Sequence, residues 1–126
     1  MDTHKRASLI AEWKEAEHFA IIGWDTSALD YEITEDPLPW SFETMVRQAL
    51  ADTDSLLDLG TGGGERLLQY RDLWPSKVAV TEGYPPNIHL VKQRLLPLGV
   101  EVRHAHESIH DVLPYDNEEF SLVTCR

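Results

Sequence analysis

The chain has 126 residues, of which 42% are hydrophobic, and this length and composition predict one domain with a modest core. No apolar run approaches the roughly 18 residues that a membrane span needs, and the N-terminus lacks the apolar core of a signal peptide. The one cysteine, Cys125, excludes an internal disulfide framework. We therefore expect a cytoplasmic protein without membrane partners.

The formal net charge is -11 at pH 7, and acidic residues dominate the stretch 25–58. That stretch holds nine acidic residues and one basic residue, Arg47. Such a surface repels a phosphate backbone, so the charge disfavours nucleic acid as a partner.

The first 54 residues predict an N-terminal helical extension. Leu9, Ile10, Trp13 and Ala16 fall at helical spacing, which favours a helix that packs on the core. Ser41 is a typical N-cap for a second helix. That helix carries Met45, Val46, Ala49 and Leu50.

A glycine-rich turn follows the apolar run 56–59. Four glycines within five positions imply backbone angles or close approaches that a side chain would forbid. The dinucleotide-binding pattern Gly-x-Gly-x-x-Gly fits Gly60 and Gly62, but Glu65 takes the third position. A carboxylate suits the first turn of a helix, yet it would repel a pyrophosphate docked there. The turn therefore predicts a ligand with a nucleoside and no phosphates.

The segment 77–82 predicts a strand that ends at Glu82, because Val78 and Val80 are β-branched and Gly83 follows. An acidic residue at a strand end, about 20 residues after a glycine turn, can accept hydrogen bonds from ribose hydroxyls.

The remaining pattern completes an alternation of strands and helices over residues 55–126. The segment 65–74 predicts one helix, and Asn87 is expected to cap another that carries Ile88, Val91 and Leu95. The segments 99–104 and 119–124 predict a third and a fourth strand. We predict an α/β, Rossmann-like parallel sheet with flanking helices, about four strands in the order 3-2-1-4, and a ligand crevice at their carboxyl ends.

The glycine-rich run resembles motif I of the class I S-adenosylmethionine-dependent methyltransferases. That motif has an acidic residue, one residue, Gly-x-Gly and further small residues, which Asp58, Gly60 and Gly62 fill. The resemblance implies that Asp58 acts through the methionine amino group and that the backbone 60–64 cradles the amino-acid end. It also implies that Glu82 binds the ribose diol and that the segment 83–84 runs under the adenosine.

Other stretches resemble the same family. The Leu-Pro-aromatic turn at 113–115 and the Phe-x-Leu-Val strand start at 120–123 match it, whereas the residue aligned with its adenine contact is His106, with Glu107 adjacent. The elements 23–25 and 37–40 resemble a subset of the family, in which Trp40 would cover the cofactor or the acceptor, although burial in the core is the favoured interpretation. The cofactor-binding residues implied by the resemblance are Asp58, Gly60, Thr61, Gly62, Gly64, Glu82, Gly83, His106, Glu107 and Cys125.

The family fold has seven strands, and this chain stops near the fourth. We expect a truncated, cofactor-binding half, with a fragment of a larger enzyme as the first interpretation and a homodimer through the unpaired sheet edge as the alternative. No catalytic residue can be named, and we expect no metal, because His104, His106 and His110 lack further ligands at a recognisable spacing.

The predicted function is methyl transfer from S-adenosylmethionine, with a small molecule as the acceptor. The alternatives are an S-adenosylmethionine-binding module without catalysis, an RNA methyltransferase fragment and an NAD-dependent oxidoreductase.

Overall fold

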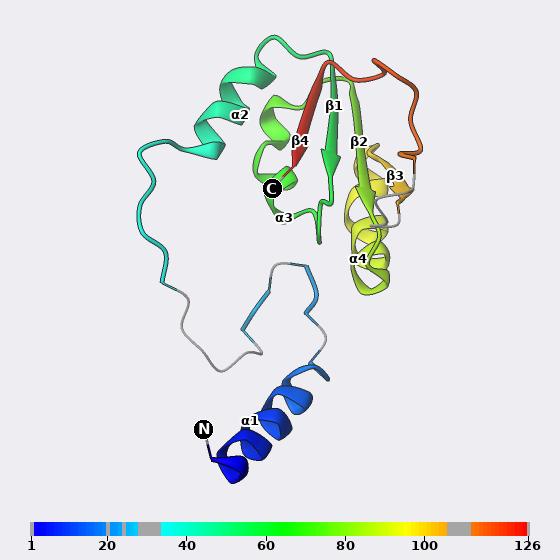
Figure 1. Ribbon diagram of the computed structural model, residues 1–126. Coiled ribbons are helices and arrows are strands. Elements are labelled where there is room, and N and C mark those ends of the chain that lie inside the picture. Colours follow the sequence, from blue (N-terminus) through cyan, green and yellow to red (C-terminus); the bar gives the residue numbers. More distant parts are fainter. Residues whose placement is uncertain (1, 20, 24, 28–33, 106–111, 126) are drawn as a thin grey trace.

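The computed structural model describes residues 2–19, 21–23, 25–27, 34–105 and 112–125, and Figure 1 shows how they are arranged. The helices are α1 (Thr3–Ala16), α2 (Phe42–Leu50), α3 (Glu65–Gln69) and α4 (Pro85–Leu95), with short 3₁₀ turns η1 (Arg71–Leu73) and η2 (Leu96–Leu98). The strands are β1 (Ser55–Leu59), β2 (Lys77–Glu82), β3 (Glu101–His104) and β4 (Leu122–Cys125). The described helices include none that is both long and apolar enough to cross a membrane.

The four strands form one parallel sheet in the order β3-β2-β1-β4, which confirms the predicted α/β topology. β1 is central, and Leu57 pairs with Ala79 on β2 and with Val123 on β4. Because all strands are parallel, the glycine turn after β1 lies at the same sheet edge as the ends of β2 and β4. β4 pairs only with β1 among the described strands, so its outer edge is open.

The hydrophobic core lies on one face of the sheet. Side chains alternate across a strand, so Leu56, Val78 and Val80 point to the same side. They pack with Val46 and Leu50 of α2, Leu67 and Tyr70 around α3, Val91 and Leu95 of α4, and Val100. The helix α2 therefore belongs to this core, although it lies within the predicted extension 1–54.

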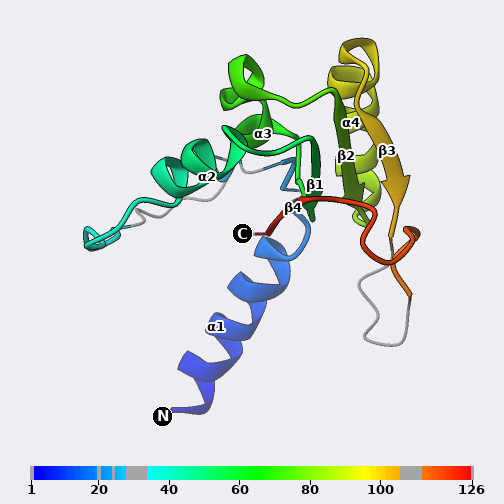
Figure 2. The same ribbon diagram turned by 90° about the horizontal axis from the view of Figure 1, so that it is seen from above.

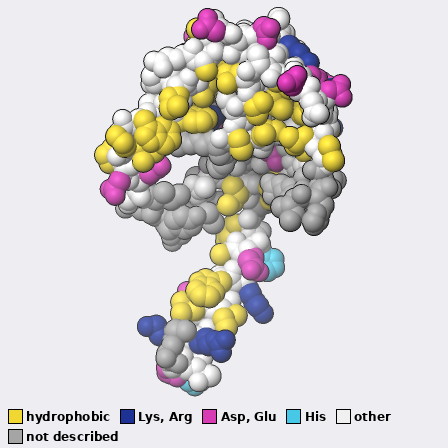
Figure 3. Space-filling model, turned by 45° about the horizontal axis from the view of Figure 1, so that its top comes forward, with side chains coloured by type: hydrophobic (Ala, Val, Ile, Leu, Met, Phe, Trp, Pro, Cys, Tyr) yellow, Lys and Arg dark blue, Asp and Glu magenta, His cyan; other side chains and the backbone are white. Residues whose placement is uncertain are grey.

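The prediction that the first helix packs on the core is wrong. α1 forms as expected, but it has no buried residue and Trp13 is 64% exposed. Figures 1 and 2 show α1 projecting away from the sheet, and Figure 3 shows basic, acidic and hydrophobic side chains interspersed along it. The few apolar residues of α1 are interspersed with charged ones, so the helix has no continuous apolar face to bury. The favoured burial of Trp40 is also wrong, because this side chain is 54% exposed.

Several helix boundaries differ from the predictions. The helix expected over 65–74 ends at Gln69, and a separate 3₁₀ turn follows. Asn87 does not cap α4, whose N-cap is Tyr84; two prolines supply the first turn, where a missing N–H costs nothing. Ser41 does cap α2, as predicted, by accepting a hydrogen bond from the Thr44 amide at 3.2 Å.

Both outer strands are shorter than expected. β3 begins at Glu101 because Gly99 ends η2 with a left-handed φ of 81°. β4 begins at Leu122, where pairing with Leu56 starts.

Candidate functional site

The glycine turn after β1 adopts a backbone that only glycine takes readily. Gly60, Gly62 and Gly64 have φ values of 63°, 65° and 81°. The turn is tied to β2, because the Thr61 amide donates to the Thr81 carbonyl at 3.1 Å and the Gly60 amide to the Thr81 hydroxyl at 3.3 Å. The predicted unusual backbone angles are therefore present, and the turn has a fixed position at the sheet edge.

Glu82 points toward this turn from the end of β2. One carboxylate oxygen accepts the Gly62 amide at 2.7 Å, and the other accepts the amides of Gly83 and Tyr84, both at 2.9 Å. The side chain is buried, with 5% of the residue exposed. A carboxylate offers about four acceptor positions, so three are used and one stays available on the oxygen that faces Gly62. Glu82 thus shapes the turn and keeps one acceptor position for a ligand hydroxyl.

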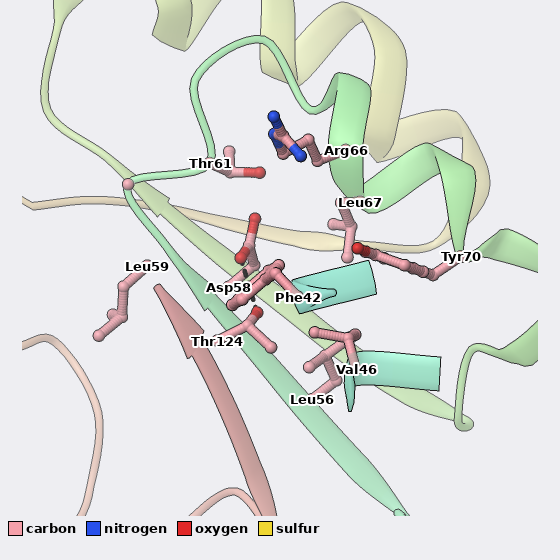
Figure 4. Close-up of a pocket in the computed structure, with 11 residues that line it drawn as sticks. Phe42, Val46, Leu56, Asp58, Leu59, Thr61, Arg66, Leu67, Tyr70 and Thr124 are labelled. Atoms are coloured by element: carbon pink, nitrogen blue, oxygen red, sulfur yellow. Dashed lines mark hydrogen bonds between the residues drawn. The ribbon is translucent and has the colours of Figure 1, made fainter. Parts of the chain in front are cut away.

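Asp58 lies half-buried near the end of β1, and Figure 4 shows it directed into a narrow cleft. Its carboxylate accepts a hydrogen bond from the Thr124 hydroxyl at 2.6 Å. Burial raises the pKa of Asp58, and the hydroxyls of Thr124 and Thr61 oppose that rise. The Thr61 hydroxyl faces the same cleft and is buried, and it makes no hydrogen bond of normal geometry with a described residue. The cleft therefore presents a carboxylate with a buried hydroxyl beside it.

Three hollows follow one another along this edge of the sheet. The Glu82 hollow, of about 280 Å³, is lined by Ile21, Gly23, Gly60, Gly62, Glu82, Tyr84 and Asn87. The Asp58 cleft, of about 20 Å³, shares Gly60 with it and has a mostly apolar lining: Phe42, Val46, Leu56, Asp58, Leu59, Thr61, Arg66, Leu67, Tyr70 and Thr124. The Trp40 hollow, of about 770 Å³, shares Phe42 and Arg66 with the cleft and is lined by Glu35, Asp36, Pro37, Leu38, Trp40, Ser41, Glu43 and Cys125.

The N-terminal segment is fastened to the site by contacts that the sequence did not reveal. The Gly23 amide donates to the buried Asn87 side chain at 2.6 Å. Glu65 forms an ion pair with Arg94 at 3.0 Å, and a Cβ on Gly23 would lie only 2.2 Å from the Glu65 Oε1 atom. We call this set of four residues the Gly23 clasp. Its one sequence signal is a glycine in an otherwise aromatic and aliphatic stretch.

The clasp also changes how Glu65 is understood. Its carboxylate was expected to repel a pyrophosphate at the start of α3. In the structure Arg94 pairs with it and also donates to the Gly63 carbonyl at 3.0 Å. The charge is partly neutralised, so Glu65 by itself is a weaker argument against a phosphate ligand than the sequence suggested.

The predicted cofactor-binding residues are not all found at the hollows. Asp58 and Thr61 line the Asp58 cleft, Gly62 and Glu82 line the Glu82 hollow, and Gly60 lines both. Gly64 is the N-cap of α3, where a Cβ would lie 3.1 Å from the Leu95 side chain, and Cys125 is exposed in the Trp40 hollow. His106, Glu107 and His110 lie outside the described residues. Within the described ranges, no three His, Cys, Asp or Glu residues are grouped to hold a metal ion.

Comparison with known proteins identifies the fold. No protein-family model matches the chain, and no curated protein matches it. Among solved structures, CalS10 from Micromonospora echinaspora, an amino pentose methyltransferase with S-adenosylmethionine bound, is 27% identical with a TM-score of 0.50. The match covers 67% of this chain and 33% of CalS10.

Two further structures share the fold. YcgJ from Bacillus subtilis is 18% identical with a TM-score of 0.53, and the match covers 67% of this chain and 36% of YcgJ. The N-terminal domain of EvdMO1, solved in the presence of S-adenosylhomocysteine and D-fucose, is 22% identical with a TM-score of 0.50, covering 98% of this chain and 54% of that one. The chain thus spans between a third and about half of the structures it matches.

The chain therefore has a Rossmann-like α/β fold and is similar to the cofactor-binding half of a class I S-adenosylmethionine-dependent methyltransferase. The observed strand order and glycine turn agree with that class.

Proposed function

We propose that this chain binds S-adenosylmethionine and supplies the cofactor side of a methyltransferase whose acceptor is a small molecule. The observation that carries the proposal is the order of the three hollows along the sheet edge. Gly60 joins the Glu82 hollow to the Asp58 cleft, and Arg66 joins the cleft to the Trp40 hollow. A ligand with a nucleoside at one end and an amino acid at the other would follow this path.

The residues present fit the cofactor. Glu82 has one acceptor position left for a ribose hydroxyl, and the glycine turn leaves room where side chains would intrude. The buried Thr61 hydroxyl makes no hydrogen bond of normal geometry with a described residue, which is a second sign that a polar ligand group belongs here, because buried polar groups normally have partners. The chemistry that the cofactor supplies when bound is an electrophilic methyl group on sulfur.

The role of the protein in such a transfer is alignment. Holding an acceptor atom, the methyl carbon and the sulfur in line removes much of the entropic barrier. In this chain the fixed glycine turn, held by Glu82 and Thr81, would position the cofactor. The described residues give no group that we assign as a general base.

A small acceptor is supported by the Trp40 hollow. Its volume of about 770 Å³ falls within the usual range of small-molecule sites. Its lining includes the acidic residues Glu35, Asp36 and Glu43, of which Glu43 pairs with Arg47, and their negative charge would repel a nucleic-acid backbone. CalS10, described as an amino pentose methyltransferase, gives a precedent for a small acceptor on this fold.

Calorimetric titration with S-adenosylhomocysteine and with NAD tests the proposal. We expect saturable binding of the first and none of the second. Saturable binding of NAD alone would overturn the assignment and favour an oxidoreductase.

A second assay separates an enzyme from a binding module. Methyl transfer from S-adenosylmethionine is measured against a panel of small alcohols, amines and amino sugars, with RNA as the comparison substrate. Binding without transfer to any acceptor would favour a module that holds the cofactor without catalysis.

A further inference from the structure

We infer that Arg66, together with Thr61 and Asp58, recognises the α-amino acid end of the ligand, with Arg66 as the residue that selects for its carboxylate. This inference rests on the proposed function and adds a residue that neither the sequence motif nor the fold comparison assigns. It predicts that the site distinguishes a nucleoside that carries an amino acid from one that lacks the carboxylate.

The first observation is the position of Arg66. It is the second residue of α3, directly after the glycine turn, and lines both the Asp58 cleft and the Trp40 hollow. Figure 4 shows its guanidinium group on the same side of the cleft as the Thr61 side chain. Arg66 forms no hydrogen bond or ion pair with any described residue, whereas Arg47, Arg94 and Arg103 all pair with carboxylates.

The second observation is a pair of polar groups in a cleft whose lining is otherwise mostly apolar. The Thr61 hydroxyl is buried, with 3% of the residue exposed; it lies close enough to Asp58 to lower the pKa of that carboxyl, but it makes no hydrogen bond of normal geometry with a described residue. Across from it the Asp58 carboxylate uses one oxygen for Thr124. The Asp58 carboxylate attracts a cation that donates hydrogen bonds, and the Thr61 oxygen offers that cation a second acceptor.

The size of the cleft decides which ligand group enters it. A volume of about 20 Å³ admits one group the size of a water molecule. An ammonium group fits, with Asp58 and Thr61 as its acceptors. A carboxylate is larger and, beside Asp58, would be repelled. It belongs at the mouth of the cleft, where Arg66 offers a planar pair of donors that match its two oxygens.

Each charged group of the amino acid therefore lies next to a side chain of opposite charge. The ammonium lies against Asp58, and the carboxylate lies against Arg66. A ligand with only one of these groups leaves a charged side chain without its partner. Recognition of the amino acid thus depends on Arg66 in addition to the glycine turn.

Calorimetry with three probes tests the inference on the whole chain. The probes are S-adenosylhomocysteine, its decarboxylated analogue S-adenosyl-3-thiopropylamine, and 5′-methylthioadenosine, which lacks both charged groups. We expect the wild-type protein to prefer S-adenosylhomocysteine over the decarboxylated analogue by roughly 10- to 100-fold, as for a charge-assisted hydrogen bond. Arg66→Leu removes that preference while leaving the affinity for the decarboxylated analogue unchanged.

Arg71→Leu is the matched control. Arg71 begins η1, is exposed, and its side chain has no partner among the described residues. We expect this variant to keep the full preference of the wild type. Arg66→Lys should keep part of the preference, because a point charge replaces a planar donor pair.

The remaining outcomes overturn the inference in distinguishable ways. An unchanged preference in Arg66→Leu shows that Arg66 does not contact the carboxylate. An equal loss for all three probes shows that Arg66 supports the fold and not the ligand. Binding of 5′-methylthioadenosine without any preference in the wild type rejects the amino acid subsite and leaves the nucleoside site standing. Failure of all three probes to bind the wild type rejects the proposed function, and the inference fails with it.

Discussion

Replacing Glu82 with glutamine tests whether this side chain holds the glycine turn. The carboxylate accepts three backbone amides, from Gly62, Gly83 and Tyr84, at 2.7 to 2.9 Å. An amide side chain has only one oxygen, and its NH₂ group must face at least one of these backbone donors. The substitution therefore breaks one or two charge-assisted hydrogen bonds and leaves a buried N–H without an acceptor.

The expected cost follows from those contacts. A hydrogen bond to a charged group contributes about 1.5–3 kcal/mol, and a buried donor without a partner costs about 1–3 kcal/mol. These terms overlap, so we expect Glu82→Gln to lower the free energy of unfolding by about 2–4 kcal/mol. Urea denaturation followed by circular dichroism measures this change without any ligand.

Glu101→Gln is the matched control on the neighbouring strand. Glu101 pairs with Arg103 at 2.7 Å, but its side chain is 46% exposed, and exposed pairs contribute at most about 1 kcal/mol. Equal urea midpoints for Glu82→Gln and Glu101→Gln would refute the argument that the Glu82 carboxylate fixes the turn. A large stability loss in Glu82→Gln alone would support it.

Three further predictions concern the clasp, the cleft and the turn at 113–115. A Cβ on Gly23 would lie 2.2 Å from the Glu65 Oε1 atom, so Gly23→Ala has to displace the Glu65 carboxylate, and the φ of 63° adds about 1–3 kcal/mol of strain. We expect faster proteolysis within 21–27, whereas Gly99→Ala, at a φ of 81° with open space around it, should not speed cleavage there. Burial raises the pKa of Asp58, so the stability that depends on its protonated form is complete below about pH 4 and is lost as the pH rises. The urea midpoint of Asp58→Asn should therefore exceed that of the wild type at pH 7 and equal it below pH 4. A lower midpoint for Asp58→Asn at pH 7 would contradict this. Burial raises the pKa of Tyr115 to about 12, so the wild type should lose stability as the pH rises from about 10 to 12. Tyr115→Phe should lose less stability over that range in urea titrations. Below pH 10 this variant should be less stable than the wild type by about 1 kcal/mol, because it lacks the hydrogen bond to the β2 main chain.

Much of the fold followed from local patterns. The apolar runs before the glycines and before Glu82 marked β1 and β2, and short alternating segments marked β3 and β4. Crossover connections between parallel strands are right-handed, which limits the possible strand orders of the sheet to a few. The observed order β3-β2-β1-β4 is one of them. Local patterns failed where a neighbouring residue controlled the backbone, as when two prolines and not Asn87 began α4.

By itself, the sequence determined the glycine turn, the acidic residues at Asp58 and Glu82, and their placement at one sheet edge, because spacing and backbone preference are local properties. Only the tertiary structure decided which groups keep free hydrogen-bonding capacity. Glu82 turned out to hold three amides and Asn87 to bind Gly23 across the fold, while Arg66, beside the buried Thr61 hydroxyl, pairs with no residue in the part of the chain that the structure describes. These facts depend on contacts between residues distant in the chain, and the exposure of Trp13 and Trp40 depends likewise on what the rest of the molecule covers.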